Sequence, residues 1–388
     1  MAKVLNLQRE LVHIAAALNI YGFASALIGV FIPLVILKSG GQLWQIAVFY
    51  LIYALVKLVL NYPITLLIQR KGAHFGIAAG FIGGTLEMLA ILGFASNQNV
   101  GLLVAGAMAL SLTNAFVWNS QHLFISQAMQ NETKSSNLAT ISILGQFTDI
   151  VAPALGGFIG TFFGSKYLLL LALVLCLVAL IPLRGMRDII SNSTTLAKIE
   201  YNFSGAPPKD LLANFFYNIE TSIGVMVWPI YLAVYIKTFK SIGLITSIAA
   251  IATILSIWLA GHRGDKGKDR QVLKQGAAIS SIVHIARIFV FSAVPVTIVS
   301  SAYRASLAYL QNAWTSTYYY HAKKKGLQYI MSMEIACDLA YVTLWGMLLI
   351  ILLAVDSRAF FVASFIIAAV AAWGCLLITR QSKSREAQ

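Results

Sequence analysis

The stretch AGHRGDKGKDRQVLK, residues 260–274, decides the fold of this chain because of what lies on either side of it. It holds five basic and two acidic residues between two apolar runs, SIGLITSIAAIATILSIWL and QGAAISSIVHIARIFVFSAVPV. The chain of 388 residues is 59% hydrophobic and only 11% charged, whereas roughly a quarter of the residues in a soluble protein are charged. Charge concentrated between such runs indicates a polar loop that joins two membrane-spanning helices.

Apolar runs of about 20 residues, the length that crosses a hydrocarbon core, recur along the whole chain. Only a helix satisfies its own backbone hydrogen bonds in lipid, and the runs are too long for barrel strands. The sequence therefore predicts an all-α integral membrane protein. Its twelve transmembrane helices are expected at 12–37, 42–68, 74–95, 101–128, 138–163, 166–184, 210–236, 241–260, 273–295, 297–320, 327–354 and 358–379.

The distribution of Lys and Arg predicts the orientation of these spans. Twenty of the 28 lie at the termini or in loops after even-numbered spans, five lie in loops after odd-numbered spans, and three lie within spans. This bias places both termini in the cytoplasm of a multi-pass protein of the plasma (inner) membrane. The net charge of +14 is then attracted to lipid headgroups. We expect the lipid bilayer as a partner, and no nucleic acid.

When the sequence is compared with itself at an offset of 196 residues, four distinctive features in the first half align with similar features in the second half, which indicates an internal repeat. The pairs are Pro33 with Pro229, residues 69–72 with 265–268, Trp118 with Trp314, and Arg184 with Arg380. Shared topology of similar helices is the alternative explanation. The repeat predicts a six-helix bundle at 1–184, a cytoplasmic linker at 185–209, and a second six-helix bundle at 210–388 with a short cytoplasmic tail.

Two six-helix halves, together with the loops after the second span of each, resemble the major facilitator superfamily. Its signature there reads approximately Gly-x-x-x-Asp-Arg-x-Gly-Arg-Lys, and the first half departs from it with Gln69 at the acidic position. The resemblance implies a latch that closes the cytoplasmic side, with its carboxylate near a helix N-terminus. A short basic loop without this role is the alternative. The residues that match are Arg70, Gly72, Gly261, Asp265, Lys266 and Lys268.

The fifth span resembles a signature that proton-driven exporters of the family carry, Gly-x-x-x-Gly-Pro-x-x-Gly-Gly. The run GQFTDIVAPALGGFIG, residues 145–160, supplies Pro153, Gly156 and Gly157, but has Ala152 before the proline. The resemblance favours export. Glycines also allow close helix packing, a role that any transporter can use.

Ionisable residues within a span cost about 3 kcal/mol each to insert, so each is a functional hypothesis. Lys57 and Asp338 both lie about eleven residues from the cytoplasmic ends of their spans, and a rise of about 1.5 Å per residue gives them equal depth. Because the family's second and eleventh spans face each other, Lys57 and Asp338 are a candidate ion pair between the halves. Glu334 shares a helix face with Asp338 and could carry a proton or belong to a structural network.

In the family, the first, fourth, seventh and tenth spans line a central cavity. This implies a substrate and proton pathway formed by Tyr21, Asn114, Trp118, Asn218, Glu220, Arg304 and Gln311, with Asp149 of the fifth span at similar depth. Glu220 is expected to be a lone mid-membrane acid that binds a proton or cation, or else a hydrogen-bonded packing residue. His284 and Arg287 lie on a peripheral span and are expected to brace helices.

These features predict a secondary active transporter of a small solute that works by alternating access. We expect coupling to protons through Glu220 or Asp149, with efflux by antiport. An uptake symporter, a facilitator of sugars or metabolites, and a lipid flippase are the alternatives. No HExxH, CxxC, Gly-x-Ser-x-Gly or Walker motif is present, so an enzyme, a metal site and a cofactor are not expected. The proton gradient would be the driving force, and we expect a monomer.

Overall fold

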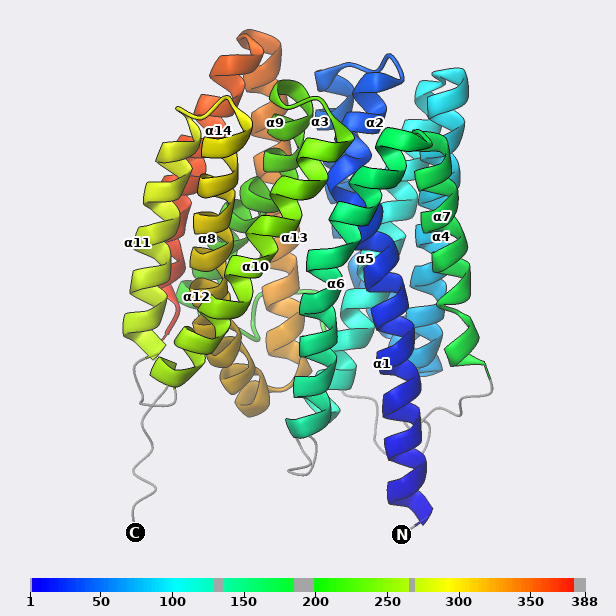
Figure 1. The fold of residues 1–388 in the computed structure, drawn as a ribbon. Coiled ribbons are helices and arrows are strands. Elements are labelled where there is room, and N and C mark those ends of the chain that lie inside the picture. The colour runs from blue at the N-terminus through cyan, green and yellow to red at the C-terminus, as the bar shows by residue number, and fades with distance from the viewer. Residues whose placement is uncertain (1, 129–134, 185–198, 265–268, 380–388) are drawn as a thin grey trace.

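The computed structural model describes residues 2–128, 135–184, 199–264 and 269–379, and these ranges form twelve spans (Figure 1). The all-α fold class and the twelve predicted spans are confirmed. The spans are α1 (Ala2–Ile28) with α2 (Ile32–Lys38), α3 (Leu43–Lys71), α4 (Ala73–Asn97), α5 (Val100–Ala128), α6 (Ser135–Phe162), α7 (Ser165–Val178), α8 (Pro208–Ser222) with α9 (Trp228–Tyr235), α10 (Phe239–Gly264), α11 (Asp269–Arg287), α12 (Ala293–Lys325), α13 (Leu327–Ala354) and α14 (Ser357–Gly374).

Several boundaries differ from the prediction: α1 begins at Ala2 rather than near residue 12, α7 ends at Val178 rather than near 184, and the turn between α11 and α12 lies earlier than predicted. Helix α11 ends at Arg287 rather than near residue 295, and α12 begins at Ala293 after Ser292, whose backbone is extended. Pro295 then lies in the first turn of α12, where its missing N–H has no helical partner to lose. Because apolar residues continue through this turn, charge and polarity in the sequence do not mark it.

The first span of each half changes its helical geometry just before a proline. A 3₁₀ turn at Gly29–Phe31 joins α1 to α2 and precedes Pro33, and a single π-helical turn at Ile223–Val227 joins α8 to α9 and precedes Pro229. Proline lacks an N–H and its ring crowds the carbonyl four residues earlier, so the preceding turn adopts another hydrogen-bonding pattern. The two interruptions occupy equivalent positions of the repeat.

The helices form two six-span halves that stand side by side (Figure 1). The halves meet where α3 packs on α13, α6 on α10, and α2 on α9. The start of α1 and the end of α14 lie at the same, lower end of the bundle, which we call the terminal side. This is the predicted 6+6 arrangement. Most of the predicted linker, residues 185–198, lies outside the described residues, so its boundaries stay predictions.

Close contact between α6 and α10 depends on two glycines. A Cβ atom at Gly157 would lie 2.8 Å from the Phe239 carbonyl oxygen and 3.1 Å from the Gly243 Cα. Both distances are too short for a side chain, so only glycine allows this approach of the two halves. The glycine of the exporter-like signature at this position therefore has a packing role.

By length and composition, eight of the helices in the described ranges are long and apolar enough to cross a membrane. The remaining spans are α6, the interrupted α8–α9, α11 and α12. These four carry Asp149, Glu220, Arg287 and Arg304 respectively. Three further charged residues, Lys57, Glu334 and Asp338, lie on α3 and α13, which are among the eight more apolar helices.

Candidate functional site

A cavity of about 290 Å³ lies between the two halves. This volume is close to the lower end of small-molecule sites, about 300–1,000 Å³. The interrupted segments of both halves reach it, through Gly29 on one side and Gly224 on the other. Its other lining residues include Ser25, Asp149, Pro153, Trp228, Pro229, Thr246, Arg287, Ser300, Tyr303 and Arg304.

Within the cavity, one ion pair joins the two halves. Arg304 Nη1 on α12 lies 3.7 Å from Asp149 Oδ2 on α6, and the two side chains are 32% and 40% exposed. An exposed pair of this kind contributes little to stability, about 0–1 kcal/mol. Both side chains are therefore free to exchange this contact for one with a proton or a solute.

A second arginine reaches the same cavity from α11. The Arg287 side chain is fully buried, and its guanidinium lies 4.2 Å from the centre of the Trp228 ring and 4.0 Å from that of Tyr303. Arg287 Nη1 is 3.3 Å from His284 Nδ1. Among the described residues, neither Nε nor Nη2 of Arg287 has a hydrogen-bond partner. Buried polar groups are normally paired, so these two donors require an explanation.

Glu220 lies in a buried chain of polar groups rather than alone in the cavity. Its Oε1 accepts a hydrogen bond from the Ser280 hydroxyl and lies 3.1 Å from His284 Nε2. The second nitrogen of His284 continues the chain to Arg287. The sequence analysis placed His284 and Arg287 at the periphery, and the structure connects them to the cavity instead. The sequence does contain a sign of this connection, because Ser280, His284 and Arg287 follow the i, i+4, i+7 spacing that places residues on one helix face.

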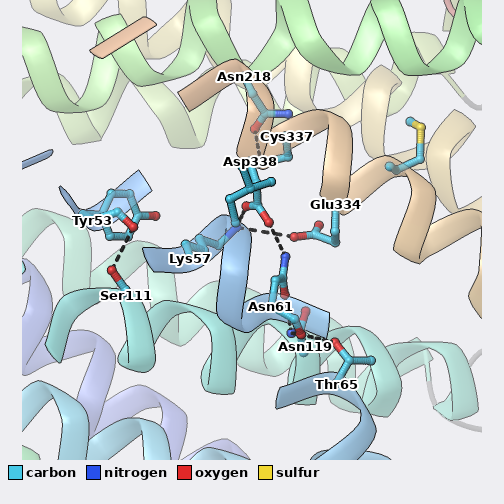
Figure 2. Close-up of polar contacts among 12 residues, drawn as sticks. Tyr53, Lys57, Asn61, Thr65, Ser111, Asn119, Asn218, Glu334, Cys337 and Asp338 are labelled. Carbon is cyan, nitrogen blue, oxygen red and sulfur yellow. Dashed lines mark hydrogen bonds and ion pairs between the residues drawn. The ribbon is translucent and has the colours of Figure 1, made fainter. Parts of the chain in front are cut away.

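A separate polar network joins the halves through α3 and α13 (Figure 2). Lys57 Nζ donates to Asp338 Oδ1 at 2.5 Å and lies 3.6 Å from Glu334 Oε2. The Lys57 and Asp338 side chains are 3% and 0% exposed. The structure thus brings together the three residues that the sequence analysis grouped, and the pair that was matched by depth is in direct contact.

Amide and imidazole groups extend this network to α5 and α12. Asn61 Nδ2 donates to Asp338 Oδ2 at 2.6 Å, and Asn119 Nδ2 donates to Asn61 Oδ1 at 2.6 Å. His122 Nε2 lies 3.4 Å from Glu334 Oε1, and its Nδ1 is 3.0 Å from the Tyr319 hydroxyl. The buried charges therefore have partners on four helices, which ties the two halves together.

The same place contains a group of side chains with metal-ligand chemistry. Ligand atoms of Glu334, Cys337 and Asp338 all lie within 4.8 Å of one another. The Lys57 ammonium already makes its contacts with both carboxylates, and Cys337 Sγ donates to Asn218 Oδ1 at 3.1 Å. In this arrangement the lysine supplies the positive charge that a cation would otherwise bring.

The remaining predicted pathway residues lie at different places. Asn218 Nδ2 donates to the Asn214 carbonyl at 2.8 Å, so Asn218 connects successive turns of α8 and, through Cys337, α13. Tyr21 stacks on Phe81 of α4 with 4.5 Å between ring centres, inside the first half. Of the three other residues predicted for the pathway, Asn114 is half-buried, and Trp118 and Gln311 are exposed.

The predicted latch is only partly described. Arg70 is exposed at the end of α3, and Gly72 joins α3 to α4 with φ of 94°, a backbone conformation that favours glycine. Gly261 lies within α10. Asp265, Lys266 and Lys268 lie outside the described residues. The latch therefore stays a prediction.

Known proteins similar to this chain are transporters. Residues 14–199 match the family model described as Major Facilitator Superfamily. No curated protein matches the chain. Among solved structures, a bacterial homologue of the iron transporter ferroportin in an inward-facing state is 15% identical, with a TM-score of 0.68 over 96% of this chain and 98% of that one.

Two further solved structures have the same fold. A nucleoside transporter is 13% identical, with a TM-score of 0.68 over 97% of this chain and 100% of that one. The E. coli fucose:proton symporter is 11% identical, with a TM-score of 0.62 over 96% of this chain and 98% of that one. At these identities the likeness establishes the fold and leaves the solute open.

Proposed function

Because residues 14–199 match the Major Facilitator Superfamily model and the chain has the fold of solved transporters, we propose that it is a proton-coupled secondary transporter of this superfamily rather than an enzyme, and that a small solute passes through the cavity between its halves. The observation that carries the proposal is the convergence of three features at one cavity. These features are the interrupted span of the first half, the interrupted span of the second half, and the Asp149–Arg304 pair. Interrupted helices at equivalent repeat positions typically form the substrate site of a transporter.

Contacts between the halves on both sides of the cavity support an alternating mechanism. On the side away from the termini, α2 packs on α9. Toward the terminal side, Lys57 of α3 binds Asp338 of α13. In this mechanism, each set of contacts would have to open for a solute to pass through its side of the protein. Rocking of one half against the other opens either set in turn.

Asp149 is the acid that we propose to bind the coupling proton. Of the two acids that the sequence analysis favoured, Asp149 lines the cavity with 40% of its side chain exposed, whereas Glu220 is fully buried beside His284. Protonation of Asp149 would remove the negative charge opposite Arg304. The two halves would then lose their ion pair in the cavity, which couples proton binding to their relative position.

The predicted direction of transport rests on the fifth-span signature. The sequence favoured efflux by antiport on the fifth-span signature, and Gly157 of that signature has a packing role. Efflux therefore stays a prediction, with uptake by symport as its alternative. On the positive-inside bias we further propose that the terminal side faces the cytoplasm of the inner membrane.

Proteoliposomes with an enclosed pH dye and a clamped membrane potential test this proposal. Solutes from a panel of sugars, nucleosides, organic acids and cationic drugs are added outside. Symport acidifies the lumen as the solute enters, and antiport makes the lumen more alkaline. We expect a solute-dependent pH change of one sign that is lost in Asp149→Asn.

Asp356→Asn is the matched control, because Asp356 caps α14 at the surface and does not line the cavity. This variant should retain the pH change. Solute uptake without any pH change would contradict proton coupling. A full pH change in Asp149→Asn would contradict the role of Asp149 and leave transport itself intact.

A further inference from the structure

We propose that the cavity recognises the anionic group of its solute through Arg287 and Arg304, so that the transported solute is a small organic acid or phosphate compound. This inference rests on the proposed transport function, because it names the class of solute that the cavity takes. Both arginines line the cavity, and they come from neighbouring helices, α11 and α12.

The first observation is that one edge of the Arg287 guanidinium, formed by Nε and Nη2, has no hydrogen-bond partner among the described residues. Nη1 faces His284, which leaves Nε and Nη2 without partners among the described residues. These two N–H groups point in the same direction along one edge of the planar group. A carboxylate or phosphate accepts such a pair of parallel hydrogen bonds.

The environment of Arg287 holds that edge in place. Trp228 and Tyr303 flank the guanidinium, and the Trp228 indole N–H donates to Ser300 Oγ at 3.0 Å. The Tyr303 hydroxyl is buried and also lacks a partner within the described part of the chain. Arginine fixed in this way before the ligand arrives is preorganised for binding.

The charge balance of the cavity is the second observation. The ionisable groups that line it or connect to it are Asp149 on α6, Glu220 on α8, His284 and Arg287 on α11, and Arg304 on α12. With both acids charged and His284 neutral, their charges cancel. A proton on Asp149 leaves one net positive charge, which an anionic solute would neutralise. Proton and anion would then favour each other's binding.

Water in the cavity is the alternative partner for the Arg287 donors, since the cavity is polar and large enough to hold it. Water can accept the hydrogen bonds, but it brings no negative charge to a fully buried cation. The anion therefore accounts for the free donors and also neutralises the net positive charge that protonation of Asp149 leaves in the cavity.

Binding to the purified protein in detergent tests this inference without any gradient. The probes are inorganic phosphate, short mono- and dicarboxylates and sugar phosphates at millimolar concentration, each organic acid paired with its amide and each sugar phosphate with the free sugar. The measurement is the shift in melting temperature and the affinity derived from it. We expect at least one acid to stabilise the protein while its uncharged partner does not.

The variants assign that binding to the two arginines. Loss of a charged bidentate contact should weaken the affinity about 10- to 100-fold in Arg287→Gln. Arg304→Gln should weaken it as well, and its partly exposed side chain makes misfolding less of a concern. Arg358→Gln is the control, because Arg358 lies beside Phe291 outside the cavity lining and should bind like the wild type.

Failure of this inference differs from failure of the proposed function. The anion site is wrong if no acid stabilises the wild type, if amides and free sugars bind as well as the acids, or if the acids bind both variants at full affinity. Proton-linked transport of neutral or cationic solutes would then still support the transporter. Conversely, anion binding that depends on Arg287 without any proton movement supports the site and overturns the coupling.

Discussion

Replacement of Lys57 by methionine should be more damaging than replacement of its closest partner, Asp338, by asparagine. Methionine keeps most of the length of the side chain but removes the charge. In Lys57→Met, two acids one turn apart, Glu334 and Asp338, remain buried without the ammonium that both contact. In Asp338→Asn, Lys57 keeps its ion pair with Glu334 at 3.6 Å, and the oxygen of the new amide can still accept the hydrogen bond from Asn61.

The distances give the relative size of the two effects. At an effective dielectric constant of about 20, the gross attraction of unit charges is about 7 kcal/mol at the Asp338 distance and about 5 kcal/mol at the Glu334 distance. When Asp338 is neutral, the contact with Glu334 thus keeps about 5 of the roughly 12 kcal/mol of gross attraction, whereas Lys57→Met removes all of it. We expect Asp338→Asn to lower the free energy of unfolding by about 1.5–3 kcal/mol, the value of a charged hydrogen bond. Removal of the Lys57 charge, which contacts both acids, should cost about 3–5 kcal/mol.

Reversible unfolding by titration with a denaturing detergent measures these values, with the double variant Lys57→Met/Asp338→Asn completing a cycle. The double variant should be more stable than Lys57→Met alone, with a coupling energy of about 0.5–3 kcal/mol. Lys166→Met is the matched control, because Lys166 is exposed at the start of α7 and should change stability by less than about 0.5 kcal/mol.

Hydrogen exchange in the same variants connects this stability to function. Because the pair bridges α3 and α13, its loss should raise exchange at the terminal ends of those two helices more than elsewhere. The reasoning is refuted if Lys57→Met is as stable as the wild type, if Asp338→Asn is the more damaging change, or if exchange rises uniformly.

Three further predictions concern other parts of the molecule. Gly157→Ala should lower the melting temperature, because its Cβ would meet the backbone of Gly243, whereas Gly145→Ala, whose Cβ would meet no described atom within 4 Å, should not; equal melting of the two would contradict this packing. Glu220→Gln should fold but transport less, because Glu220 balances the charge of Arg287 through His284, and full transport activity in that variant would argue against this role. Asp265→Asn should slow turnover more than it weakens binding, as the latch hypothesis requires; unchanged turnover would count against the latch.

The sequence predicted the spans because crossing a membrane is a local requirement. About 20 apolar residues are needed wherever a helix crosses, so each span is visible without its neighbours. The equal depth of Lys57 and Asp338 was visible for a similar reason, since the rise per residue of a helix is fixed. The turn at 288–292 was missed because its residues are as apolar as the helices that it joins.

By itself, then, the sequence determined that the chain is a helical membrane protein, that it has twelve spans in two repeats, and how deep each charge lies. Only the tertiary structure decided which way each side chain faces. Glu220 turns to His284, Tyr21 turns to Phe81, and Arg287 reaches the cavity. The physical reason is that lipid-facing and buried surfaces of a transmembrane helix are both apolar. Its sequence therefore fixes length and depth, while rotation about its axis depends on packing against the neighbouring helices.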